Sequence, residues 1–165
     1  MARLLLLSAL TLLLLPASAL AEDCTYNDLH GKFTITADCE GLADHSGLGQ
    51  EHKRIWLAGT WGQLQMFEIT EPHRRAELDF VMSNLGRDWG ARKTPEKTQV
   101  IQLFGVEGRM VTERKIRSTV TTYVFPLDGV NVIVNAIAYG NNRKVREESL
   151  QKIRKAFLET FAATK

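Results

Sequence analysis

The chain has 165 residues, 44% of them hydrophobic, with 21 basic and 19 acidic side chains and a net charge of +2. Such a balance excludes a general long-range attraction to nucleic acid or to anionic lipid. The length and hydrophobic fraction are those of one globular domain with a core of its own.

An export leader is predicted at the N-terminus. Arg3 precedes an apolar run over residues 4–15, which is too short to span a bilayer, and Pro16 ends that run. The small residues Ala19 and Ala21 then flank Leu20 in the pattern that a signal peptidase recognises, and we expect cleavage after Ala21.

The expected organisation is thus a signal peptide over residues 1–21 and a single domain over residues 22–165. Cleavage leaves 144 residues and lowers the net charge to +1. No later run is long and apolar enough for a transmembrane segment, so we expect a periplasmic or secreted protein.

Two cysteines, Cys24 and Cys39, follow the leader. In an oxidising compartment they are expected to form a disulfide, and closing a loop of this size contributes roughly 3 kcal/mol in the chain-entropy model. The alternative, a redox-active or metal-binding thiol pair, is disfavoured because the spacing is not that of a CxxC motif. Between them, residues 32–38 alternate as a strand.

Residues 40–51 are rich in glycine and are expected to form an exposed loop. Asp44, His45, Glu51 and His52 are residue types that bind metals. Their spacing lacks the regularity of a zinc site, so a solvated loop is preferred and no metal site is predicted.

Residues 53–70 are predicted to form a β-hairpin with its turn at 58–62. It carries Trp56 and Trp61, which are the candidates for contacts with a ligand or partner. An exposed tryptophan often marks such a contact, whereas the alternative is that one or both cover the core.

A first helix is predicted over residues 71–89, because Leu78, Val81, Met82 and Leu85 recur with helical spacing. A strand meander follows over residues 99–139.

In the meander, residues 126–129 form a turn, and residues 130–139 carry apolar side chains on both faces, as a central strand does. Arg114, Lys115 and Arg117 belong to a more polar strand. Charges there are typical of a protected sheet edge, and the alternative is a binding role.

A second helix is predicted over residues 143–162, capped by Asn141 or Asn142. Its apolar stripe consists of Val145, Leu150, Ile153, Phe157 and Phe161. Its outer face is basic, with Lys144, Arg146, Lys152, Arg154 and Lys155. This face is either an ordinary solvated surface or a surface for an acidic partner or lipid headgroups.

The expected fold class is α+β, an antiparallel sheet of about six strands packed between two amphipathic helices as an α-β-α sandwich. Four stretches carry a resemblance: GKFTITADCEGL, FVMSNLGRDW, TTYVFPLDGVNVIVNAIA and SLQKIRKAFLETF. In the order of these elements the chain resembles the exported PsbP-like/DcrB-like proteins. The resemblance implies an accessory or binding protein without catalytic residues.

No nucleotide-binding, hydrolase-elbow or zinc-protease motif occurs. We therefore expect no catalytic residue and no cofactor, and a non-enzymatic accessory or binding protein with an unidentified protein or small-molecule partner. The alternatives are a periplasmic protein that binds a small ligand or metal, and a small enzyme whose site is assembled only in three dimensions.

Overall fold

The computed structural model describes residues 23–28, 31, 33–38, 41–46, 53–69, 77–82, 98–160 and 162–163. The predicted leader and Cys39 lie outside this part of the chain, so the cleavage after Ala21 and the disulfide stay predictions. Among the helices that are described, none is both long and apolar enough to cross a membrane.

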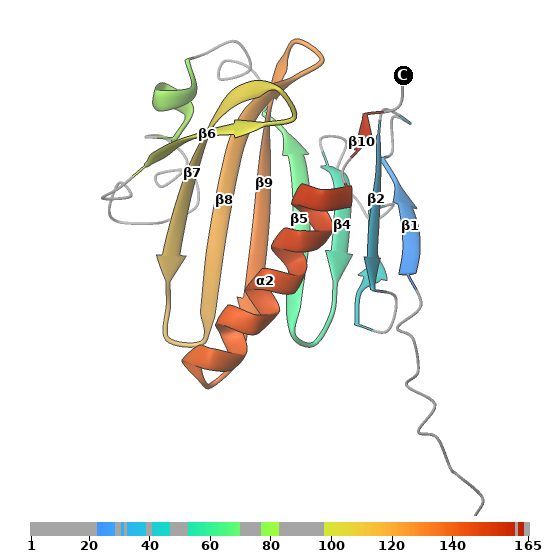
Figure 1. Ribbon diagram of the computed structural model, residues 1–165, viewed down its shortest axis with the longest axis vertical. Coiled ribbons are helices and arrows are strands. Elements are labelled where there is room, and N and C mark those ends of the chain that lie inside the picture. Colours follow the sequence, from blue (N-terminus) through green and yellow to red (C-terminus); the bar gives the residue numbers. More distant parts are fainter. Residues whose placement is uncertain are drawn as a thin grey trace, which may run out of the picture.

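A seven-stranded antiparallel sheet forms the centre of the molecule (Figure 1). Its strands lie in the order β3-β4-β5-β9-β8-β7-β6. Their bounds are β3 Ala43–Asp44, β4 Lys53–Ala58, β5 Gly62–Glu68, β6 Gln99–Leu103, β7 Val106–Arg114, β8 Ser118–Leu127 and β9 Val130–Tyr139.

The strand predicted to be central, β9, has three strands on each side. Val134 lies opposite Met66 of β5 and Tyr123 of β8, and all three are buried. The β8–β9 connection is a two-residue turn in which Asp128 and Gly129 both have positive φ, 52° and 78°. These values match the type I′ turn that suits the twist of a hairpin.

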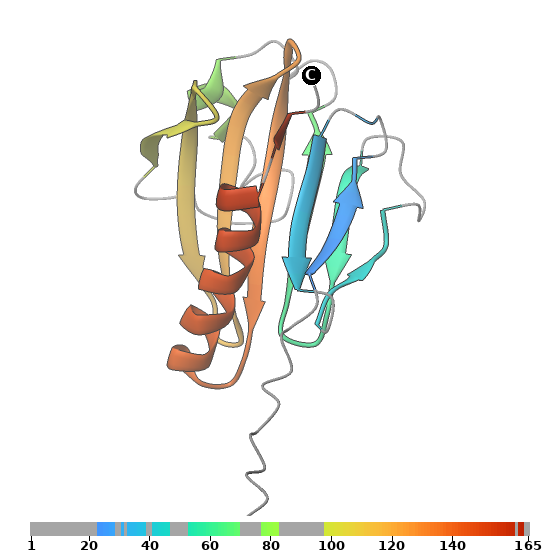
Figure 2. The ribbon, with the colours of Figure 1, turned by 45° about the vertical axis from the view of Figure 1, so that its right-hand side comes forward.

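One face of this sheet is covered by helix α2 (Arg143–Thr160) and by a second, three-stranded sheet that lies beside it (Figure 2). The second sheet has the order β1-β2-β10, with β1 at Asp23–Asn27, β2 at Phe33–Asp38 and β10 at Ala162–Ala163. We call this covered side the α2 face. Its core includes Ile35 of β2 together with Ile153 and Phe157 of α2.

The opposite face of the sheet is covered in part by a helical segment at residues 78–82. Val81 and Met82 are buried there against Val111, Val124 and Ile133, as the predicted stripe requires. Residues 71–76 and 83–89 of the predicted first helix lie outside the described chain. Apolar packing on both faces of the large sheet confirms the α+β class.

The strand count exceeds the predicted six, since seven strands form the large sheet and three the second. Strand β3 lies in the segment predicted as loop and pairs with β4, Ala43 opposite Ala58. Both β3 and β10 are two residues long. Strands this short show no alternation that a sequence pattern can detect.

Helix α2 begins where it was predicted. Asn142 is its cap, because the side-chain Oδ1 accepts a hydrogen bond from the backbone N–H of Lys144 at 2.8 Å. Leu150, Ile153 and Phe157 are buried, but Val145 is 48% exposed and was wrongly assigned to the stripe. Val145 stands in the first turn of the helix, beyond the reach of the core.

A buried ion pair joins the two sheets. Arg54 of β4 donates two hydrogen bonds of 2.9 Å to the carboxylate of Asp28, which follows β1. Arg54 is 1% exposed and Asp28 3%. Glu68 of β5 approaches the same guanidinium at 3.4 Å. The two-pronged geometry compensates each charge for the loss of water.

We predict that Asp28→Ala lowers the free energy of unfolding by about 3 to 5 kcal/mol, because it removes the two-pronged partner of the buried Arg54 charge, and the contact with Glu68 is longer. Denaturant unfolding of the two proteins measures this difference. The double variant Asp28→Leu/Arg54→Met is the control, since removing both charges is expected to cost far less. Equal losses in the two variants would contradict this account.

Candidate functional site

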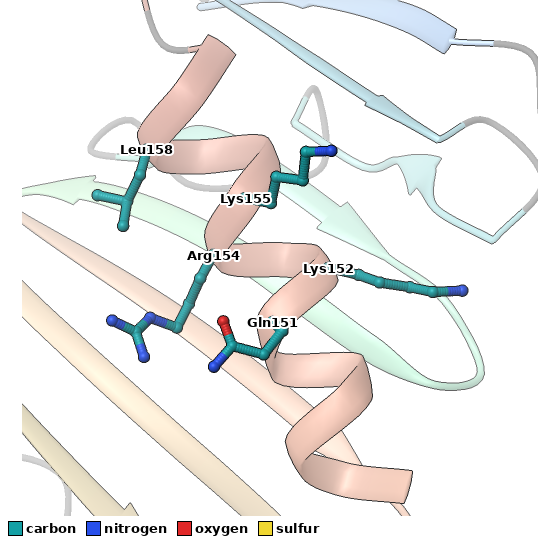
Figure 3. Close-up of a pocket in the computed structure, with 5 residues that line it drawn as sticks. All are labelled: Gln151, Lys152, Arg154, Lys155 and Leu158. Carbon is teal, nitrogen blue, oxygen red and sulfur yellow. The ribbon is translucent and has the colours of Figure 1, made fainter.

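A shallow, open depression of about 360 Å³ lies on the outer surface of α2 (Figure 3). Gln151, Arg154 and Leu158 point to one side of the helix, and Lys152 and Lys155 point to the other. These five residues line it, and none of them is a carboxylate. The lining is therefore positively charged.

Arg154 is held in place from below by the large sheet. Its Nε donates a hydrogen bond of 2.9 Å to the hydroxyl oxygen of Tyr123 on β8. Tyr123 is 1% exposed and its ring lies 5.2 Å from that of Phe157. A rigid, buried phenol thus positions a half-buried guanidinium at the edge of the depression.

Burial raises the pKa of Tyr123 above its usual range, although the charge and the hydrogen bond of Arg154 act in the opposite direction. The phenol therefore stays neutral at physiological pH. It offers Arg154 an oxygen acceptor without neutralising the positive charge of the guanidinium.

Lys152 is positioned by Trp61, one of the two tryptophans that were predicted as contacts. The Lys152 ammonium lies 5.7 Å from the ring centroid of Trp61, a distance typical of a cation–π interaction. Trp61 itself is half-buried and packs against the core. It therefore covers the core and supports a surface cation at the same time.

Two glycines leave room for the Trp61 indole ring. A Cβ placed on Gly41 would overlap the indole ring, and a Cβ on Gly59 would overlap the carbonyl oxygen of Gly41. Glycine at both positions allows the β4–β5 turn to pack closely against the segment before β3.

The cations of α2 have different neighbours in its two halves. In the first half, Arg143 lies 3.8 Å from Glu147, and Lys144 lies 3.9 Å from Glu148. In the second half, Lys152, Arg154 and Lys155 gather around the depression. The ordinary solvated surface expected for this face and its alternative, a surface for an acidic partner or lipid headgroups, both stay predictions.

Trp56, the second predicted contact, lies elsewhere. It stands on β4 opposite Gln65, on the side of the sheet away from α2, and its ring centroid is 5.3 Å from that of His45. The two tryptophans thus project from opposite faces of the sheet. A single cleft lined by both of them does not form.

The residues considered for a metal do not converge in the described chain. Asp44 accepts a hydrogen bond from the backbone N–H of Ser46 at 2.8 Å, and His45 packs on Trp56. Glu51 and His52 lie outside the described residues. Within the described ranges, no group of three or more metal-binding side chains occurs.

The contact between Arg154 and Tyr123 was not predicted. Both residues were placed on elements that the sequence identified, a basic helix face and a strand of the meander. They are 31 positions apart, and neither periodicity states which turn of a helix lies over which strand residue. Only the packing of α2 on β8 brings them together.

We predict that Arg154→Gln raises the pKa of Tyr123 further, since it removes the nearby charge that now lowers it. The ultraviolet absorbance of tyrosinate during an alkaline titration measures the change, and Tyr123→Phe identifies which transition belongs to this residue. Because the folded-state pKa is raised, the free energy of unfolding is expected to fall as the pH rises above the unfolded-state pKa. An unchanged or lower pKa in Arg154→Gln would contradict the hydrogen-bond geometry.

Comparison with known proteins places the fold but not a family. No family model matches the chain, and no curated protein matches it. The solution structure of cyanobacterial PsbP (CyanoP) from Synechocystis sp. PCC 6803 is similar, with a TM-score of 0.57, 8% identity and coverage of 90% of this chain and 96% of that one. The crystal structure of the Ran-binding protein Mog1p from Saccharomyces cerevisiae is also similar, with a TM-score of 0.53, 11% identity and coverage of 87% and 96%. The resemblance seen in the order of elements is confirmed at the level of architecture, and this chain has a PsbP-like fold.

Proposed function

We propose that this chain is an exported, non-enzymatic accessory protein that binds an acidic surface of a protein partner through the second half of α2. One observation carries the proposal: the depression on α2 brings together three cationic side chains, Lys152, Arg154 and Lys155. Two of these cations are positioned by aromatic side chains, Trp61 and Tyr123. Positioned cations lose less conformational freedom when they bind an anion.

The chemistry of the lining supports recognition rather than catalysis. It consists of an amide, two amines, a guanidinium and a leucine side chain. Lysine and arginine form charge-assisted hydrogen bonds with carboxylates, and the planar guanidinium suits them especially well. Because the depression is open, water screens these charges, as is usual for a surface of association.

Apolar side chains beside the cations support a protein as the partner. Leu158 is 37% exposed at the depression, and Phe104 of the β6–β7 turn is 41% exposed beside the same half of α2. The Phe104 ring lies 5.6 Å from that of Phe157. Arginine and aromatic residues are enriched in protein interfaces, and a small apolar area beside charges is typical of them.

The solved neighbours give independent support for this kind of role. Mog1p is described as a Ran-binding protein, so a chain of similar fold binds another protein. Export rests on the leader predicted over residues 1–21, and the non-enzymatic assignment on the chemistry of the depression.

The proposal is tested by cross-linking the processed protein in its native compartment, purifying the cross-linked partner and measuring its affinity. We expect Lys152→Glu/Lys155→Glu to weaken binding at least roughly tenfold, since each charge reversal replaces an attraction with a repulsion. The affinity of the wild type is expected to fall with increasing salt.

The matched control is Lys115→Glu/Arg117→Glu, which makes the same change in net charge on a different surface. We expect it to leave the affinity for the protein partner unchanged. Equal weakening by both double variants, or a partner that binds both as tightly as the wild type, would contradict the assignment to α2.

A further inference from the structure

The turn between β7 and β8 presents an aliphatic side chain to solvent. Ile116 is 91% exposed, the highest value among the exposed large hydrophobic residues described. Lys115 and Arg117 flank it, and a hydrogen bond of 2.8 Å from the Lys115 N–H to the Ser118 carbonyl closes the turn. A hydrophobic side chain held between two cations thus forms an apex.

Protection of a sheet edge accounts for only part of these charges. Strand β6 pairs with β7 from Val106 to Met110, whereas the end of β7 that includes Arg114 is paired with β8. Lys115 and Arg117 follow the last residue of β7, Arg114, and belong to the turn. Edge protection suits Arg114, and the alternative that the sequence offered, a binding role, is developed here for Lys115 and Arg117 in the turn.

The apex is fixed against the start of α2 (Figure 1). Arg146 donates through Nη1 to the carbonyl oxygens of Ile116 and Gly140, at 3.2 and 2.7 Å. The Gly140 N–H donates to the carbonyl of Arg117 at 3.2 Å. This network brings Val145, which is 48% exposed, to the same end of the molecule.

Cations gather at this end. We define the basic tip as Arg114, Lys115, Ile116, Arg117, Arg143, Lys144, Val145 and Arg146. Glu147 and Glu148 of α2 approach three of its cations at 3.3 to 3.9 Å in exposed positions. These two carboxylates stand against six cations, so the tip keeps a net positive charge.

The position of two of these cations is unfavourable for the helix itself. Arg143 and Lys144 stand in the first turn of α2, which contains no acidic residue. The helix dipole already makes this end positive, so cations there cost stability. Their presence enlarges the positive field around Ile116 instead.

We propose that the basic tip binds an anionic phospholipid surface, with Ile116 and Val145 entering the interfacial region and the surrounding cations contacting lipid phosphates. The shape of the tip favours lipid over protein as the occupant. A convex apex with one aliphatic side chain finds apolar surroundings by entering a fluid interface, whereas a protein partner would need a matching pocket. Lysine and arginine next to an inserted apolar group are typical of peripheral membrane contact.

The small net charge is consistent with this mode of binding. Screening limits the field of exposed charges to about 8 Å at physiological ionic strength. The tip therefore acts on contact rather than at long range, and one or two inserted side chains give reversible attachment. The depression on the second half of α2 belongs to a separate surface.

The test uses the processed protein purified from producing cells and measures its co-sedimentation with vesicles. Vesicles containing phosphatidylglycerol and phosphatidylethanolamine are compared with vesicles of phosphatidylcholine alone. We expect binding to the anionic vesicles, much weaker binding to the neutral ones, and loss of binding as salt is raised.

Two changes at the tip separate its apolar and electrostatic contributions. Ile116→Asn is expected to weaken partitioning about tenfold, since it removes one inserted aliphatic side chain. Lys115→Glu/Arg117→Glu is expected to weaken it more, roughly a hundredfold, because two attractions become repulsions. Ile116 is almost fully exposed, so its replacement should leave thermal unfolding unchanged.

Matched controls lie outside the tip. Val100→Asn alters another exposed aliphatic residue, 62% exposed on β6, and Lys152→Glu/Lys155→Glu makes the same charge change on the second half of α2. Both are expected to bind vesicles like the wild type.

Several outcomes would overturn the proposal. The first is failure of the wild type to bind anionic vesicles. The second is an equal loss of vesicle binding in a control variant and in the matching variant of the tip. The third is unchanged vesicle binding by Ile116→Asn. Competition by a soluble acidic peptide that removes the protein from vesicles at low salt, together with unchanged binding by Ile116→Asn, would identify the tip as a surface for acidic proteins. These outcomes do not test the proposed protein partner of α2, because the affinity for that partner is measured without lipid.

Discussion

The architecture depends on covering one wide face of a sheet that is centred on β9. The apolar side chains of β4, β5, β9 and β8 on this face extend beyond the width of one helix. Helix α2 therefore covers the centre, and the sheet of β1, β2 and β10 covers the side nearest β4. The Arg54–Asp28 ion pair joins this second layer to the first, in a position from which water is excluded. This pairing favours the observed placement of the N-terminal hairpin, because separating the two charges would remove the two-pronged contact that offsets their loss of water.

The packing of α2 on the sheet also determines which surfaces are exposed and available for binding. Because α2 lies on the sheet with its Ile153 and Phe157 side buried, its charged side faces solvent at residues such as Lys144, Lys152 and Lys155. Two aromatic residues that belong to the core, Tyr123 and Trp61, reach the edges of the helix and hold cations there. The core and the proposed binding surface therefore share side chains. The same aromatic side chains thus stabilise the core and hold the cations in place. A cation that is already held loses less conformational entropy when it binds an anion.

Two surfaces with different physical character follow from one helix. The first half of α2 meets the β7–β8 turn and forms a convex end with exposed aliphatic groups. The second half borders a shallow depression beside Phe104 and Leu158. Convex, cationic and partly apolar surfaces suit a fluid lipid interface, whereas a depression with fixed cations suits a structured acidic partner.

The sequence by itself determined the elements whose patterns are local. Period-two alternation located the meander and the central strand, and helical spacing located the buried Leu150, Ile153 and Phe157. The pair Asn141 and Asn142 marked the start of α2, and the structure identifies Asn142 as the cap. The short strands β3 and β10 have too few residues to show a period. Val145 was misplaced because a stripe does not reveal where the core ends. Only the tertiary structure decided that Trp56 and Trp61 lie on opposite faces, that Arg54 meets Asp28, and that Arg154 rests on Tyr123. These contacts join residues far apart in the chain, and local periodicity contains no information on which helix turn packs over which strand residue.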